Sequence, residues 1–328
     1  MKSGIKRVPN CTRPSKRSLA AYTASPMWTA LLGEVQETPY KIFWNSLSLV
    51  GLRNARALLP QCYRDTTFYF DGVDDCVALT IDDALCRNGR STSLISEVRQ
   101  LLAKHEARCT FFTCSKYLDG VEDLAGELVK DGHEFGNHMA EDLAFHYNKL
   151  PPAEFASELR ETTRAIEALP NRPPVRWFRA PQGMLTEPMR EAVVSQQLRH
   201  ALGDAYCDDW AMEHNAPYVS RTLLSQCQAG SILILHMPEV GFREHTLKVL
   251  EEVLDGLSKR KLKCVTLTQA AEMSERATGG GGAERQPPAE EPASNPVAGL
   301  ASWLPLFSAR RHGEQDPGRL VDGRLPQR

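Results

Sequence analysis

The feature that most constrains the fold is an alternation of short apolar runs with longer amphipathic stretches between residues 76 and 267. The apolar runs have the length of β-strands, and the stretches between them place apolar residues at helical spacing. The predicted strands are Cys76–Ile81, Cys109–Phe112, His133–Asn137, Arg176–Arg179, Ala201–Asp204, Ile232–His236 and Cys264–Leu267. The predicted helices are Leu94–Lys104, Val121–Lys130, Ala153–Leu169, Glu187–Gln197, Ser220–Gln228 and Arg243–Lys259. Strands that alternate with helices predict a parallel sheet.

The fold class that fits this pattern is α/β, a distorted (β/α)7 TIM-like barrel, because at this chain length a closed or partly closed sheet is favoured over an open one. The chain has 328 residues, of which 42% are apolar, enough to fill the core of one barrel-sized domain. The net charge is −2, and Lys and Arg are scattered through the centre, so no nucleic-acid partner is predicted. No run of 18 apolar residues occurs, so no transmembrane segment is predicted.

The two ends of the chain differ from this central region. Residues 1–33 carry six Lys or Arg and no Asp or Glu, which is typical of an organellar transit peptide or of a disordered basic arm. Residues 34–69 contain apolar residues at roughly helical spacing and predict an N-terminal helical extension. The barrel is expected over residues 70–275. Residues 276–328 contain four consecutive glycines and are otherwise rich in Pro, Glu and Arg, which predicts a disordered C-terminal tail.

The nine cysteines bear on the compartment of the protein. They are odd in number, none forms a Cys-x-x-Cys pair, and several lie inside apolar runs. A reduced thiol in such a run behaves as a small apolar side chain, so we predict reduced core cysteines rather than a disulfide framework. Together with the basic N-terminus, this favours an organellar or cytoplasmic location.

Five short motifs follow the predicted strands and carry most of the candidate chemistry. They are Thr80–Asp83, Asn137–His138, Arg179–Gly183, Asp209–Trp210 and Ile234–His236. A barrel of parallel strands gathers its functional residues at the carboxyl ends of those strands. We therefore expect side chains from all five motifs to converge on one site.

A metal site is one candidate at this convergence. Asp82 and Asp83 leave the first strand on different sides, so one carboxylate can face a metal and the other a reacting water. A solvated pair of loop acids is the alternative. Asp83 and His138 offer an oxygen and a nitrogen ligand. Asp142, four residues after His138, is the best placed third ligand. Other acids or histidines in the same segment are Glu141 and His146.

Arg179 and His236 are candidates for orientation and proton transfer. The Arg179 guanidinium has the fork geometry to hold a carboxylate, although a structural salt bridge would use the same geometry. Pro181 and Gly183 after it predict an unusual loop whose amides face a substrate. His236 ends the most apolar strand. It is either a satisfied core residue or a general acid whose pKa is set by a carboxylate such as Asp209.

The ordered set of motifs resembles the polysaccharide deacetylase family, the carbohydrate esterases with NodB homology, over roughly residues 70–273. That family reads Thr-Phe-Asp-Asp, His-Ser/Thr-x-x-His, Arg-x-Pro-x-Gly, Asp-Trp and Leu-x-His in this order. The second motif departs from the pattern, because Asp142 stands where the family has its second histidine. In this respect the chain looks like some fungal members related to chitin deacetylases. The fourth motif is compressed, which leaves Asp208 as a substitute for Asp209.

The resemblance implies a role for each motif residue. The implied catalytic residues are Asp82 as base, His236 as acid, Arg179 orienting Asp82, and Asp209 tuning His236. The implied substrate contacts are Pro181, Gln182, Trp210 and Tyr206, with a main-chain amide near Gln182 holding the oxyanion and Trp210 walling the acetyl pocket. The implied metal ligands are Asp83, His138 and Asp142. Zn²⁺ is the expected ion, and the extra carboxylate also admits Co²⁺ or Mn²⁺.

The implied activity is metal-dependent hydrolysis of a carbon–nitrogen bond that is not a peptide bond. The enzyme would remove N-acetyl groups from N-acetylated sugars, in chitin or a related polysaccharide, by means of a metal-activated water. One alternative is a catalytically impaired pseudoenzyme that binds carbohydrate. Another is a hydrolase of small cyclic amides such as ureides or imides. The resemblance also makes an extracellular location an alternative to the one that the composition favours.

Overall fold

The computed structural model describes residue 53, residues 59–171 and residues 173–279. Its strands form one parallel sheet in the order β5-β4-β3-β2-β1-β6, and β7 pairs with the beginning of β1. The strands are β1 (Cys76–Ala84), β2 (Thr110–Thr113), β3 (Glu134–Asn137), β4 (Trp177–Phe178), β5 (Arg199–His200), β6 (Ile232–His236) and β7 (Lys263–Val265). A bridge between Ala205 and Leu233 joins the segment after β5 to β6. The sheet therefore curls back on itself into a distorted barrel, as predicted.

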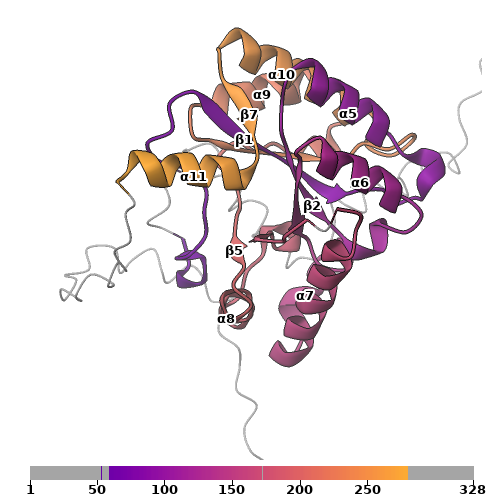
Figure 1. The fold of residues 1–328 in the computed structure, drawn as a ribbon, viewed down its shortest axis with the longest axis vertical. Helices are drawn as coiled ribbons and strands as arrows, with labels where there is room; N and C mark the ends of the chain where they lie inside the picture. The colour runs from indigo at the N-terminus through magenta and orange to yellow at the C-terminus, as the bar shows by residue number, and fades with distance from the viewer. Residues whose placement is uncertain (1–52, 54–58, 172, 280–328) are drawn as a thin grey trace, which may run out of the picture. The chain divides into compact units, whose positions relative to one another are not determined.

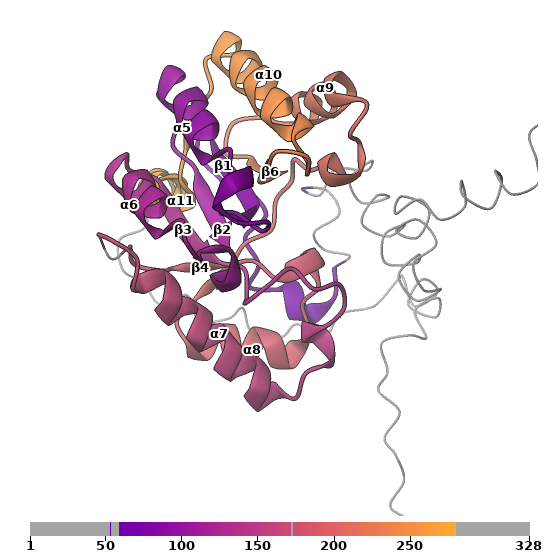
Figure 2. The same ribbon diagram turned by 90° about the vertical axis from the view of Figure 1, so that its right-hand side faces the viewer.

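The helices lie around this curled sheet, as Figures 1 and 2 show. The α-helices are α5 (Ile95–Lys104), α6 (Glu122–Lys130), α7 (Pro152–Glu167), α8 (Glu187–Ser195), α9 (Ala216–Gln226), α10 (His245–Lys259) and α11 (Leu267–Ala277). The 3-10 turns are η2 (Gln61–Tyr63), η3 (Arg90–Thr92), η4 (Ser115–Tyr117), η5 (Tyr147–Lys149), η6 (Pro181–Gly183) and η7 (Asp209–Ala211). Helix α5 packs on α6, α7 on α8, and α10 on both α9 and α5, whereas α11 packs against β1.

Some of the predicted elements differ from the structure. The predicted helix at Ser220–Gln228 begins four residues earlier, because α9 is Ala216–Gln226. The predicted strand at Ala201–Asp204 is wrong in position: β5 is Arg199–His200, and single bridges at Ala201 and Ala205 follow it. The predicted strand at Cys264–Leu267 ends early, because Thr266 caps helix α11, which the sequence did not predict. The Thr266 side chain accepts a hydrogen bond from Gln269, whose own side chain accepts one from the Thr266 amide, which forms a capping box.

The predicted domain boundaries fall largely outside the described residues. Residues 1–33 and 280–328 are not described, and of the predicted helical extension only residues 53 and 59–69 are. Within that part, Tyr63 and Phe68 belong to the hydrophobic core. Helix α11 extends to Ala277, beyond the predicted barrel end at 275. Among the described residues no helix is both long and apolar enough to cross a membrane.

Alternation along β1 separates the inside of the barrel from its outside. Val77, Leu79 and Ile81 join the core beneath the outer helices, whereas Cys76 and Ala78 join a second cluster inside the barrel. That inner cluster also contains Phe70, Val73, Phe112, Trp177, Ala201, Ile232, Val265, Leu267, Ala270 and Ala271. The α11 residues among them close one end of the barrel. The inward positions that continue β1 are Thr80 and Asp82, so the barrel interior becomes polar toward the carboxyl ends of the strands.

The cysteines that the structure describes are free thiols. Six of the eight are buried: Cys76, Cys86, Cys109, Cys114, Cys227 and Cys264. Burial raises the pKa of the Cys76 thiol to about 11 and that of Cys264 to about 12. These thiols are therefore protonated at neutral pH and behave as small apolar side chains, in agreement with the interpretation from the sequence.

Candidate active site

Asp82 and Arg179 form a buried ion pair inside the barrel. Arg179 Nη1 donates to Asp82 Oδ1 at 2.5 Å and to Thr80 Oγ1 at 2.8 Å. The rest of the guanidinium is fixed by the main-chain oxygens of Ala201 and Leu202, and its plane lies over the ring of Phe112. Arg179 is 1% exposed. The guanidinium is thus held in one orientation and in turn orients the carboxylate, as predicted from its fork geometry.

Asp83 does not follow the strand alternation. A register shift interrupts the pairing of β1 with β2 between Ile81 and Ala84, and Asp83 adopts a left-handed backbone with φ 56°. Alternation would send its side chain toward the outer helices, but the bulge turns it to the barrel mouth, where Oδ1 lies 3.5 Å from His138 Nε2. Asp82 and Asp83 have different partners, Arg179 and Arg243 with His138, but both side chains lie at the same mouth rather than on opposite sides of the strand as alternation predicted.

Asp142 completes a cluster with Asp83 and His138. One ligand atom from each of the three side chains lies within 4.8 Å of the others. The Gln182 side chain donates to Asp142 Oδ1 at 3.0 Å and holds the carboxylate in place. The alternatives Glu141 and His146 do not belong to this cluster. Glu141 pairs with Lys116 at 2.7 Å, and the exposed His146 packs its ring on Tyr147.

The donor atoms of this cluster fit a divalent cation. His138 Nδ1 lies 2.8 Å from the main-chain oxygen of Arg179, so the ring proton sits on Nδ1 and the lone pair of Nε2 faces Asp83. Asp83 Oδ1 is buried without a hydrogen-bond partner among the described residues. Two ligands on bonds of about 2.0–2.1 Å at a tetrahedral angle lie about 3.4 Å apart, close to the observed 3.5 Å. A divalent cation between Nε2 and Oδ1 would be bound by both atoms.

Arg243 is the residue of this site that the sequence did not indicate. Its Nη1 donates to Asp83 Oδ2 at 2.5 Å, and it reaches the site from the loop between β6 and α10. Burial alone would raise the pKa of Asp83, but the charge of Arg243, together with that of His236, lowers it to about 2. Burial and the charge of Asp83 together raise the pKa of Asp142. No local pattern marks Arg243, because the contact spans 160 positions.

His236 and Asp209 form the second proton-handling pair. Asp209 is fully buried and accepts from His236 Nδ1 at 2.6 Å and from the His236 amide at 2.8 Å. Burial opposes protonation of the ring, but the Asp209 carboxylate overcomes it and raises the pKa of His236 to about 9. His236 is thus an imidazolium at neutral pH and has a proton to donate. It pairs with Asp82 in the β1–β6 register, so the two lie side by side.

The structure distinguishes Asp209 from Asp208. Asp208 Oδ1 accepts from the hydroxyl of Tyr206 at 2.6 Å, and that hydroxyl accepts from Trp210 Nε1 at 3.4 Å. Asp209 is therefore the partner of His236, and Asp208 holds two of the predicted substrate contacts together. Burial and the Asp208 charge raise the pKa of Tyr206, so its hydroxyl stays protonated and donates.

The loop after β4 has the unusual backbone that the sequence predicts. Pro181 is buried, and Gln182 adopts φ 59° within η6. The Tyr63 hydroxyl donates to the main-chain oxygen of Gly183 at 2.9 Å and anchors the loop. The side chain of Gln182 contacts Asp142, an interaction that the sequence did not predict.

Left-handed backbone recurs around the cluster. Asp83, Met139, Gln182 and Arg243 all have positive φ, between 52° and 64°. Non-glycine residues adopt this conformation rarely, and such strain concentrates at functional sites. Asp83 belongs to the cluster with His138 and Asp142, and Met139 follows His138 in the chain. Gln182 and Arg243 bind carboxylates of that cluster. Four of the nine non-glycine residues with positive φ in the described part of the chain therefore lie at this mouth.

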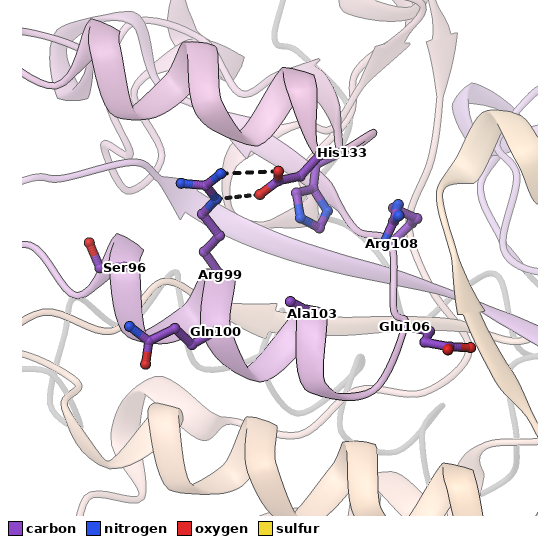
Figure 3. A pocket seen from close by; sticks show the side chains of 8 residues that line it. Ser96, Arg99, Gln100, Ala103, Glu106, Arg108 and His133 are labelled. Atoms are coloured by element: carbon purple, nitrogen blue, oxygen red, sulfur yellow. Dashed lines mark hydrogen bonds and ion pairs between the residues drawn. The ribbon is translucent and has the colours of Figure 1, made fainter.

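A separate cleft of about 820 Å³ contains none of these residues. It is lined by Ser96, Arg99, Gln100, Ala103, Glu106, Arg108, Asp131 and His133 (Figure 3). Its polar wall is already paired, because Arg99 of α5 bridges to Asp131 after α6, and His133 Nδ1 accepts from the amide of Cys109. Burial, with the charge of Arg108, lowers the pKa of His133 to about 4. This cleft is therefore not a second candidate for the chemistry of the five motifs.

Comparisons with known proteins agree with the family resemblance of the motifs. Residues 71–201 match the family model described as polysaccharide deacetylase. The uncharacterized protein YlxY of Bacillus subtilis is 27% identical over 176 residues, which cover 53% of this chain and 52% of that protein. The chitooligosaccharide deacetylase of Bradyrhizobium is 26% identical over 205 residues, covering 59% of this chain and 89% of that enzyme. The chain thus spans about half the length of the first relative and most of the second.

Solved structures share the fold. The peptidoglycan N-acetylglucosamine deacetylase Bc1960 superposes with a TM-score of 0.58 at 18% identity, over 65% of this chain and 97% of that chain. BA3943 of Bacillus anthracis, described as a pseudoenzyme of carbohydrate esterase family 4, superposes with a TM-score of 0.54 at 21% identity, over 63% of this chain and 68% of that chain. Residues 71–201, which match the family model, contain Asp82, Asp83, His138, Asp142 and Arg179. Residues 71–201 thus resemble the polysaccharide deacetylase family, and the fold shared with the solved structures agrees with that resemblance.

Proposed function

We propose that the protein is a metal-dependent hydrolase that removes N-acetyl groups from N-acetylated carbohydrates. One observation carries the proposal: a cluster of metal-ligand type, Asp83, His138 and Asp142, lies at the same barrel mouth as a carboxylate held by arginine and an imidazolium held by aspartate. Amide hydrolysis needs one group to accept the proton of water and another to give a proton to the departing amine.

Asp83, His138 and Asp142 would hold a divalent ion, for which we propose Zn²⁺. Such an ion, when bound, polarises the acetyl carbonyl and lowers the pKa of a bound water toward ~7. The main-chain oxygen of Arg179 fixes the His138 ring, and Gln182 fixes Asp142, so both ligands are oriented by neighbours.

Asp82 is the proposed base. Arg179 binds its Oδ1, which leaves Oδ2 to accept the proton of the attacking water. Thr80 and the main-chain oxygens around Arg179 keep the guanidinium from following the carboxylate if it moves. The position of the base is thus set before substrate binds. Holding a reacting group in place in this way raises the rate, because the entropy cost of orienting it is not part of the reaction barrier.

His236 is the proposed acid. Its pKa of about 9 keeps a proton on the ring at neutral pH, and Asp209 fixes Nδ1 so that Nε2 is the donor. That proton would go to the amine nitrogen as the carbon–nitrogen bond breaks. We propose that the main-chain amide near Gln182 receives the oxyanion, a contribution of about 3 kcal/mol in comparable sites. Pro181, Tyr206 and Trp210 would contact the sugar and its acetyl group.

The direct test measures metal and acetate on the same purified samples. Wild type should contain near-stoichiometric metal by mass spectrometry and release acetate from N-acetylglucosamine oligomers. Asp142→Ala should lose both. Glu141→Gln is the matched control, because Glu141 is the neighbouring acid and pairs with Lys116 outside the cluster. Asp82→Asn should bind metal as wild type does but lose activity, because it removes the base and keeps the three ligands.

Two results would point elsewhere. Oligomer binding without acetate release, after Zn²⁺, Co²⁺ and Mn²⁺ are added back, would indicate a carbohydrate-binding pseudoenzyme, the description carried by the structural neighbour BA3943. Turnover of ureide or imide rings with no turnover of oligomers would indicate a hydrolase of small cyclic amides.

A further inference from the structure

Arg243 is a buried cation that belongs to the site but to none of the five motifs. It lies in the loop before α10, with φ 52°, and is 8% exposed. Thr246 donates both its amide and its hydroxyl to the Arg243 main-chain oxygen, and the guanidinium lies 4.7 Å from the centre of the Phe242 ring. The loop therefore holds Arg243 in a strained conformation that directs its side chain to the barrel mouth.

The contact of Arg243 with Asp83 divides the two oxygens of that carboxylate. Arg243 Nη1 binds Oδ2 at 2.5 Å, whereas Oδ1 faces His138 and has no hydrogen-bond partner in the described part of the chain. A carboxylate whose second oxygen is already held by a guanidinium offers a metal one oxygen only. Arg243 therefore restricts Asp83 to a single ligand atom and fixes which atom that is.

The charges of the buried groups lead to a second consequence. Three acids of the site each face a cation: Asp82 faces Arg179, Asp209 faces His236, and Asp83 faces Arg243. Asp142 instead accepts from the neutral amide of Gln182. With three acids balanced, the site carries about one net negative charge, that of Asp142, before any metal binds. Without Arg243 it would carry two.

We infer that Arg243 is a positioning residue that offsets the second carboxylate of the metal site and restricts Asp83 to one ligand oxygen. The inference rests on the metal site of the proposed function. Arg243 has two opposite effects. Its charge repels a divalent ion and so weakens metal binding. It also keeps the net charge of the metal-bound site positive despite the two carboxylate ligands. A centre with more positive charge is the stronger Lewis acid.

The test compares metal affinity in Arg243→Gln, Arg243→Lys and wild type, by calorimetric titration of metal-free protein with Zn²⁺ and with Co²⁺. Arg243→Gln removes the charge, and we expect its Kd to fall at least tenfold. Arg243→Lys keeps the charge but not the fork, so its Kd should stay within about threefold of wild type. Circular dichroism of each variant verifies the fold. If metal-free Arg243→Gln is unstable, purification with Zn²⁺ and competition with a chelator give the same constant.

The outcomes separate this inference from the proposed function. An unchanged Kd in Arg243→Gln would overturn the charge offset and leave the metal site intact. A higher Kd in Arg243→Gln, which means weaker metal binding, would show that Arg243 acts only by orienting Asp83. If wild type binds neither ion, the metal site itself fails, and the role of Arg243 fails with it.

Discussion

Replacing Asp209 by Asn should lower the pKa of His236 from about 9 to below 6.5. Burial of the ring favours its neutral form, and the Asp209 carboxylate, which accepts from Nδ1 at 2.6 Å, reverses that preference. Asn keeps the shape of Asp but has no charge and only one acceptor oxygen for two donors. The difference between about 9 and 6.5 corresponds to about 3 kcal/mol at 1.36 kcal/mol per pH unit.

The assay is a ¹H–¹⁵N NMR titration of the histidine rings in metal-free protein. Comparison with His236→Gln assigns the signal among the nine histidines. Asp208→Asn is the matched control, since Asp208 is the adjacent acid but binds Tyr206. The pKa of His236 should stay within about one pH unit of wild type in this control. Titration of His236 near 6.5 in wild type, or above about 8 in Asp209→Asn, would refute the reasoning.

The same pair predicts the pH dependence of stability. The pKa of His236 is higher in the folded protein than the 6.5 of a free ring, so the folded state binds its proton more tightly. This contribution is complete below about pH 6.5 and is lost as the pH rises through about 9. Urea unfolding should therefore show the advantage of wild type over Asp209→Asn shrinking by up to about 3 kcal/mol between about pH 6 and pH 10. A constant difference would contradict the assigned pKa.

Three further predictions concern single residues. Arg179→Met leaves the buried carboxylate of Asp82 unpaired and should lower the free energy of unfolding by about 3–5 kcal/mol in a urea titration. Gln182→Ala removes the donor to Asp142 and should weaken Zn²⁺ binding by about tenfold or more in calorimetry, with no loss of fold by circular dichroism. Thr266→Ala removes the capping box of α11 and should cost about 1 kcal/mol of stability without changing metal affinity.

Residues that follow a local pattern were predictable from the sequence. The strand Ile232–His236 has the predicted bounds, because four consecutive buried apolar residues before His236 leave a clear apolar run. Most of the motif residues converge because they lie at or just after the carboxyl end of a parallel strand, and that end is fixed by topology; Asp209 and Trp210 instead lie in η7. The bulge that turns Asp83 toward His138 was not predictable, because no residue type around it differs from an ordinary strand end. Helix α11 was missed because its signal, the Thr266–Gln269 capping box, overlaps the end of a predicted strand.

Choices between neighbouring residues depended on the three-dimensional structure. The resemblance favoured Asp209 and left Asp208 as a substitute, and the position of η7 beside the end of β6 shows that Asp209 meets His236 while Asp208 meets Tyr206. The spacing from His138 favoured Asp142 over Glu141, and in the structure the Glu141 side chain pairs with Lys116 whereas that of Asp142 lies near Asp83.

Arg243 shows why a substitution such as Asp142 is hard to interpret from a motif alone. In the sequence, a carboxylate in place of an imidazole adds negative charge to a metal site and argues for a weaker Lewis acid. In the fold, a guanidinium 160 positions after Asp83 lies against the same site and opposes that charge. Coulomb interaction depends on distance in space and on burial, not on separation along the chain. A motif can therefore report the ligands of a metal, but the charge of the centre follows only when every buried ion around them has been placed.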